Sequence, residues 1–125
     1  MHRGSSLGMA AMTAALMACR QASADRHQPD AAAAERGRAV IERVQCAACH
    51  VIPGIDWPRG KLGPSLERID QQGLIAGRLP NTPENLASFI RNAPGHKPGT
   101  VMPAMPIDGR EARDVAQYLA EESDR

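Results

Sequence analysis

Two cysteines and a histidine in one pentapeptide, Cys46-Ala47-Ala48-Cys49-His50, constrain this chain more than any other feature. Two thiols two residues apart, followed at once by an imidazole, are the attachment pattern of a c-type haem. One short turn then presents both sulfurs to the two vinyl groups of the haem and brings the next side chain beneath the iron. The motif therefore predicts one covalently bound haem c, held by Cys46 and Cys49, with His50 as the proximal iron ligand.

The same cysteines have three other interpretations. A thioredoxin-like redox pair normally follows a strand, but no β-branched run precedes Cys46. A structural zinc site needs four ligands, and the chain has no second cysteine pair and no spaced histidine pair. A disulfide between Cys46 and Cys49 would close a very small loop and contribute little stability.

Large apolar side chains are scarce in this chain of 125 residues, for which one domain is expected. Its aromatic residues are Trp57, Phe89 and Tyr118, which make up 2% of the sequence. A domain with so few large side chains buries too little core to be stable by itself. A haem would supply the missing apolar volume, so the composition favours a cofactor without identifying it.

Residues 1–18 are predicted to be a signal peptide of the lipoprotein type. A weakly basic start precedes an apolar run that is too short to span a bilayer. Leu16-Met17-Ala18-Cys19 resembles a lipobox, in which the cysteine is lipidated and becomes the new N-terminus. Ala22-Ser23-Ala24 is a competing site for ordinary cleavage. A lipid on Cys19 would account for an otherwise odd thiol, and it predicts a periplasmic protein anchored to a membrane.

Residues 19–30 are polar and are predicted to form a flexible tether, which leaves residues 31–125 as the folded domain. Arg3 is the only charged residue of the predicted signal peptide, so its removal leaves basic and acidic residues balanced. No basic block with interleaved aromatic residues is present, which argues against nucleic acid as a partner.

The pattern of apolar residues predicts an all-α fold of three to five helices with long loops. The first helix is expected over 31–45, with Asp30 as its cap and Gly37 at a close approach of another helix. Others are expected at 65–72, after Thr82-Pro83, and from a capping box at Asp108 to about Glu122.

Prolines and glycines predict loops at 52–64 and 93–106, and the four prolines of the second segment argue against any helix there. No segment has the alternating pattern of a strand.

Three further strings accompany the cysteine motif and give the chain a specific resemblance. They are Gly63-Pro64-Ser65-Leu66, Ile75-Ala76-Gly77-Arg78-Leu79-Pro80 and Pro98-Gly99-Thr100-Val101-Met102-Pro103. From Glu35 to about Glu122 the chain resembles class I cytochrome c. It is most similar to bacterial monohaem cytochromes and to the cytochrome c domains fused to haem–copper oxidase subunit II.

The resemblance implies further roles for individual residues. Met102 would be the distal iron ligand, and a thioether opposite an imidazole raises the reduction potential. The carbonyl of Pro64 would accept the N–H of the proximal histidine and orient its ring. Thr100 would hydrogen-bond a haem propionate. Gly37 and Tyr118 would meet where the first and last helices cross.

Two other side chains compete for the distal position. Met105 lies in the same proline-rich loop as Met102, and His96 is a strong-field alternative if that loop loosens. The sequence also departs from its relatives at Gln72, which stands about where an arginine often pairs with a propionate. Either Arg68 or Arg78 compensates, or the propionate is less well neutralised.

The resemblance implies a single-electron carrier and not an enzyme. Its expected partners are a quinol-oxidising complex or a dehydrogenase as donor and a terminal oxidase as acceptor. Three alternatives stay open: a haem enzyme with an open iron position, a permanently docked subunit of a dehydrogenase or oxidase, and a lipoprotein without haem.

Overall fold

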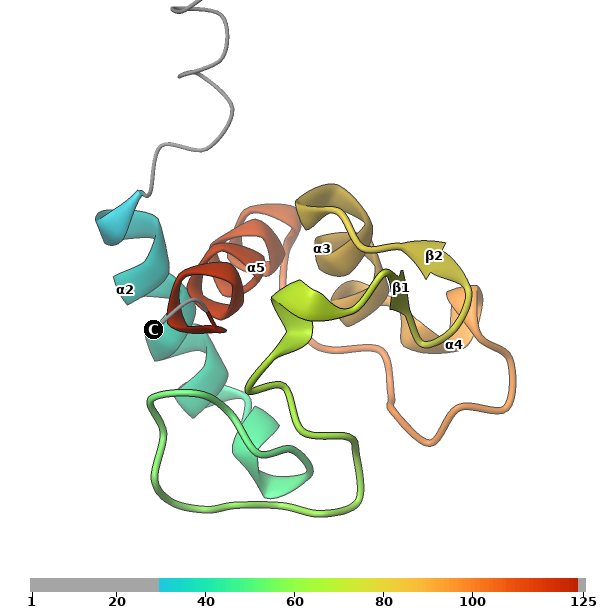
Figure 1. Cartoon of the computed structure of the whole chain (residues 1–125), viewed down its shortest axis with the longest axis horizontal. Coiled ribbons are helices and arrows are strands. Elements are labelled where there is room, and N and C mark those ends of the chain that lie inside the picture. Colours follow the sequence, from blue (N-terminus) through green and yellow to red (C-terminus); the bar gives the residue numbers. More distant parts are fainter. Residues whose placement is uncertain (1–29, 124–125) are drawn as a thin grey trace, which may run out of the picture.

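The computed structural model describes residues 30–123, which form a mainly helical domain (Figure 1). The predicted all-α class with long loops is confirmed. The predicted signal peptide, and the predicted tether apart from Asp30, lie outside the described residues. Within residues 30–123 no helix combines the length and apolarity needed to cross a membrane. The described helices are α2 (Ala31–Arg43), α3 (Pro83–Arg91), α4 (Ala93–His96) and α5 (Gly109–Ser123).

Helices α2 and α5 cross in close contact, because the crossing point carries a glycine (Figure 1). A Cβ atom on Gly37 would overlap the backbone carbonyl of Asp114 and lie 3.0 Å from Cβ of Tyr118. The predicted meeting of Gly37 and Tyr118 is therefore confirmed. Beside it, the buried carboxylate of Asp114 accepts hydrogen bonds of 2.8 and 2.9 Å from the guanidinium of Arg36.

Local signals define the helix ends. Asp30 caps α2 by accepting a hydrogen bond from the Ala33 N–H, and Thr82 caps α3 by accepting one from the Asn85 N–H. Helix α2 ends at Arg43, two residues before the predicted end. The cause is Gln45, whose φ of 62° is left-handed and turns the chain into the cysteine motif.

Two predictions about regular structure are wrong. The segment 93–106 contains a helical turn, α4, because Pro94 lies in its first turn, where no N–H partner is needed, and the Asn92 side chain caps it. A hairpin also pairs β1 (Leu74–Ile75) with β2 (Leu79–Pro80) in antiparallel register. Its turn has positive φ at both Ala76 and Gly77, so turn geometry and not strand patterning specifies it.

The predicted helix over 65–72 is reduced to one 3₁₀ turn, Ile69–Gln71. The loop between the cysteine motif and this turn is fixed to α5 by the hydroxyl of Tyr118, which donates a buried hydrogen bond of 2.7 Å to the Pro53 carbonyl. Helix α5 packs on α2 and α3, so this loop, the three helices and the segment before α5 enclose the interior.

Candidate haem site

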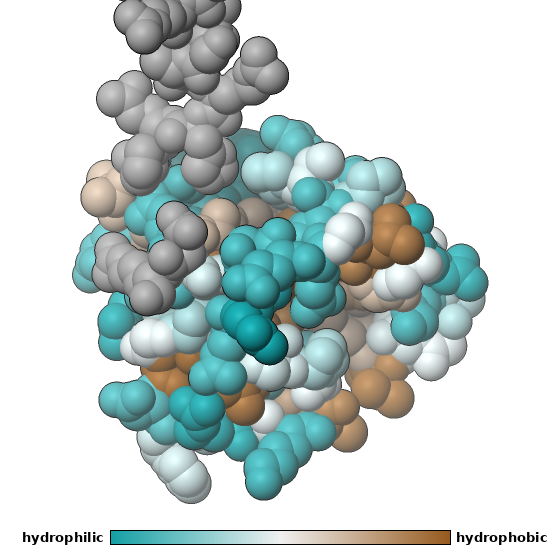
Figure 2. Space-filling view, in the orientation of Figure 1, coloured by the Kyte–Doolittle hydropathy of each residue, from teal (hydrophilic) through white to brown (hydrophobic). Residues whose placement is uncertain are grey.

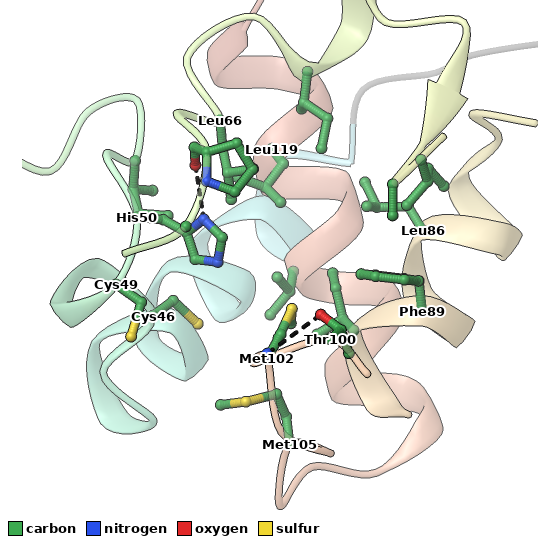
Figure 3. A pocket seen from close by; sticks show the side chains of 18 of the residues that line it. Cys46, Cys49, His50, Leu66, Leu86, Phe89, Thr100, Met102, Met105 and Leu119 are labelled. Carbon is green, nitrogen blue, oxygen red and sulfur yellow. Dashed lines mark hydrogen bonds between the residues drawn. The ribbon is translucent and has the colours of Figure 1, made fainter. Parts of the chain in front are cut away.

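The cysteine motif forms a tight turn directly after α2. Residues Cys46–Ala48 make a single 3₁₀ turn, and the carbonyl of Cys46 accepts backbone hydrogen bonds from the N–H groups of Cys49 and His50. Both thiols are free and half-buried. Burial raises the pKa of the Cys46 thiol above its ordinary value. Figure 3 shows Cys46, Cys49 and His50 together on one side of a cavity.

The imidazole of His50 is held in one orientation by the following loop. Its Nδ1 atom lies 2.7 Å from the carbonyl oxygen of Pro64. A carbonyl only accepts, so Nδ1 carries a proton, and the neutral ring has its lone pair on Nε2. Gly63 lies against the ring, where a Cβ atom would come within 2.5 Å of Nδ1. The loop thus leaves Nε2 as the ring nitrogen able to ligate a metal.

The opposite wall of the cavity comes from the loop between α4 and α5. Thr100, Met102 and Met105 lie there, facing the cysteine motif across the cavity (Figure 3). The Thr100 hydroxyl accepts a hydrogen bond of 3.3 Å from the Met102 N–H, and the Thr100 N–H donates to the Lys97 carbonyl. Both methionine side chains are half-buried, so this loop presents two thioether sulfurs to one cavity.

Apolar side chains complete the cavity, which has a volume of about 370 Å³. This volume lies within the range usual for cofactor sites, roughly 300–1,000 Å³. The remaining lining is supplied mainly by α2, α3, α5 and the 52–69 loop, including Ile41, Ile52, Leu66, Leu86, Phe89 and Leu119.

The residues present fit a c-type haem. All six predicted site residues line this single cavity: Cys46, Cys49, His50, Pro64, Thr100 and Met102. Two thiols and an imidazole on one wall, a thioether on the other and an apolar surround match the donor set and the environment of that cofactor. Residues 30–123 contain no group of three or more His, Cys, Asp or Glu side chains that could hold a metal ion.

Met105 shares the cavity with Met102, but His96 and the two candidate arginines lie outside it. His96 does not line the cavity, and its Nε2 atom lies 2.8 Å from the Ser88 hydroxyl. Arg68 and Arg78 are exposed and also lie outside the lining, whereas Gln72 belongs to it. Trp57 is 85% exposed and does not contact the cavity.

Sequence reasoning missed two apolar residues at the mouth of the cavity. Leu62 and Val101 line it, yet they are 70% and 75% exposed. Figure 2 shows a mainly hydrophilic face with small hydrophobic groups, one of them at the lower right, where Figure 1 draws the loop between α4 and α5. Their signal in the sequence was a large apolar residue within each predicted loop, Leu62 next to Lys61 and Val101 next to Met102.

Comparison with known proteins agrees with this geometry. Residues 32–119 match the family described as cytochrome c oxidase, cbb3-type, subunit III. Cytochrome c oxidase subunit 2 of Alkalihalophilus pseudofirmus is 37% identical over 84 residues, which cover 67% of this chain and 24% of that protein. The chain thus spans about a quarter of that relative. This chain therefore belongs to the class I cytochrome c family, which its match to the family of cbb3-type oxidase subunit III shows.

Proposed function

We propose that this chain is an exported single-electron carrier, a monohaem cytochrome c in which His50 and Met102 ligate the iron. Membership of the cytochrome c family implies haem-based electron transfer. The finer proposal rests on one observation: an apolar cavity with an imidazole and two thiols on one wall and a thioether on the facing wall.

Each residue of the site has a distinct part in this proposal. Haem iron, when bound, supplies one-electron redox chemistry. Cys46 and Cys49 would hold the cofactor through thioether bonds. His50 offers Nε2 because its Nδ1 proton is committed to the Pro64 carbonyl. Met102 offers a soft sulfur, which favours the reduced metal. The side chains around both proposed ligands are mainly apolar.

The partners proposed are a quinol-oxidising complex or dehydrogenase as donor and a terminal oxidase as acceptor. Both comparisons name oxidase subunits, which supports a respiratory setting. The mouth of the cavity supports short-lived contacts with a partner protein, because Leu62 and Val101 are exposed there. Lys97 belongs to the lining, and Lys61 precedes Leu62. Small apolar surfaces with charged neighbours suit transient redox docking.

We also propose that residues 1–18 direct export to the periplasm and that Cys19 carries a lipid, with 19–30 as the tether. The lipobox-like string supports this proposal. Intact-protein mass spectrometry of the membrane fraction tests it. Diacylglyceryl mass on Cys19, lost in Cys19→Ala, is the expected result. A mature protein that starts at Asp25 would instead show ordinary cleavage after Ala24.

A reduced-minus-oxidised visible and near-infrared spectrum of protein matured with a c-haem assembly system tests the carrier function. We expect low-spin bands, a sulfur-to-iron charge-transfer band, and haem stain that survives denaturation. A high-spin ferric spectrum would favour a haem enzyme, and loss of stain on denaturation would refute covalent attachment. Co-purification with an oxidase at high salt would favour a permanently docked subunit.

A further inference from the structure

One basic side chain lines the cavity. Among the described residues of the lining, Lys97 is the only Lys, Arg, Asp or Glu. The other polar side chains of the lining are those of Gln45, Gln72, Thr100, His50 and the two cysteines. Haem carries two carboxylates, and a carboxylate at an apolar cavity needs a cation or several hydrogen-bond donors.

Lys97 is half-buried and is not engaged elsewhere in the described part of the chain. Its ammonium group has no hydrogen bond or ion pair with residues 30–123. In contrast, Arg36 and Arg59 are paired with Asp114 and Glu67. A half-buried lysine of the lining, whose ammonium group has no partner within residues 30–123, is available for an anion that enters the cavity.

The backbone fixes the start of the Lys97 side chain relative to the distal loop. Its N–H donates to the Ala93 carbonyl at 2.8 Å, and its carbonyl accepts from the Thr100 N–H at 3.1 Å. The Thr100 hydroxyl already accepts from the Met102 N–H, so its proton is free to donate to a second group. One turn therefore contributes both Lys97 and Thr100 to the lining of the cavity.

We propose that Lys97, with Thr100 as second donor, pairs with one haem carboxylate and thereby sets the reduction potential. The inference rests on the proposed haem function. It also accounts for the uncharged Gln72, because Arg68 and Arg78 lie outside the lining. Lys97 is a positioning residue, since it acts on the iron through the carboxylate.

The electrostatic consequence has a definite sign. Ferric haem carries one more positive charge than ferrous haem. Loss of the Lys97 charge leaves the carboxylate uncompensated, so the oxidised form is stabilised and the midpoint potential falls. The unpaired carboxylate also binds a proton more readily, so its pKa rises and the potential becomes pH-dependent. The titratable side chains of the lining are Cys46, Cys49, His50 and Lys97. In the proposed holoprotein the two cysteines form thioether bonds and His50 ligates the iron.

The test compares the midpoint potentials of Lys97→Gln, Lys97→Arg and the control Lys61→Gln across the neutral pH range. Lys61 is exposed and lies outside the lining. We expect a lower, pH-dependent potential in Lys97→Gln only, and a partial return when Gln72→Arg is added. Equal potentials in Lys97→Gln and Lys61→Gln would overturn the inference and identify Lys97 as a docking residue at most.

A second measurement covers the case in which Lys97→Gln does not mature. The wild-type potential should stay constant across the neutral range, because a paired carboxylate remains ionised there, and Lys97→Arg should share this behaviour. A wild-type potential that falls as the pH rises would refute the pairing. Haem stain and the low-spin spectrum are recorded on every sample, so failure of the proposed function, with no covalent low-spin haem, is distinct from failure of the Lys97 inference.

Discussion

The Nδ1 atom of His50 lies 2.7 Å from the carbonyl oxygen of Pro64, fourteen residues later in the chain. This hydrogen bond joins the cysteine motif to the end of its loop and assigns the ring proton to Nδ1. Gly63 makes the bond possible, because any larger residue would occupy the space of the imidazole. A loop that contributes none of the proposed ligands thus leaves Nε2 as the ring nitrogen available for the proposed ligation.

Replacement of Gly63 should disturb the imidazole directly. In Gly63→Ala the new Cβ atom would overlap the His50 ring, so either the ring or the loop must move. We expect a mixture of spin states in the visible spectrum and a destabilisation of about 1–3 kcal/mol, typical of overpacking. Gly73→Ala is the matched control, because nothing lies within 4 Å of its Cβ position. Similar spectra for both variants would contradict the role assigned to Gly63.

The two methionines of the distal loop should differ in their effect on the iron. Met102→Ala is expected to convert a six-coordinate low-spin haem to high spin and to abolish the sulfur charge-transfer band, because the thioether ligand is lost. Met105→Ala should keep the band and lose only packing, since Met105 is half-buried in the same lining. The reverse result would assign the ligand to Met105.

The glycine at the helix crossing should tolerate no side chain. In Gly37→Ala the Cβ atom would overlap the Asp114 carbonyl, and backbone cannot move aside as a flexible side chain does. Overpacking costs about 1–3 kcal/mol, which outweighs the gain of up to about 1 kcal/mol that alanine brings to a helix. We therefore expect a lower free energy of unfolding in urea.

Gly109→Ala provides the control for this experiment. Gly109 also lies in a helix, α5, but its Cβ would find only ordinary contacts at 3.5 and 3.6 Å. This variant should be neutral or stabilised. A Gly37→Ala protein as stable as Gly109→Ala would show that α2 and α5 can separate without loss.

The Asp108 cap of α5 should make the free energy of unfolding depend on pH in the acid range. The Asp108 carboxylate accepts hydrogen bonds from the backbone N–H groups of Glu111 and Arg110, and these bonds hold its pKa below the ordinary value. The stabilisation is complete above the unfolded pKa of about 3.9 and is lost as the pH falls through the lower folded pKa.

Asp108→Asn isolates this effect, because asparagine caps a helix but does not titrate. Urea unfolding at a series of pH values should show wild type losing its advantage over the variant only below about pH 4. A difference between the two proteins that stays constant through the acid range would mean that the carboxylate charge contributes nothing.

Electron transfer to an acidic partner should slow as the ionic strength rises. Lys61 lies next to Leu62 of the lining, and salt screens its attraction to an acidic surface. Stopped-flow rates at increasing salt measure the effect, and Lys61→Gln should flatten the profile. A wild-type rate that does not respond to salt would exclude an electrostatic role of Lys61 in docking.

Local sequence signals predicted much of this fold. The Asp30, Thr82 and Asp108 caps were readable because a cap depends on residues within one turn. The close helix approach at Gly37 was readable from a glycine on an apolar helix face. The hairpin and helix α4 were missed, since the first depends on positive φ at Ala76 and Gly77 and the second on one turn closed by Asn92.

The sequence by itself predicted the chemistry of the proposed site, because residue type and spacing identify the cysteine motif with His50, and the resemblance to class I cytochrome c implies Met102. Only the tertiary structure decided which other side chains face that chemistry. Lys97 lines the cavity whereas Arg68 and Arg78 do not, and His96 meets Ser88 outside it. These assignments depend on how distant loops fold onto α5, and the direction of a loop side chain follows from such long-range packing and not from its neighbours in sequence.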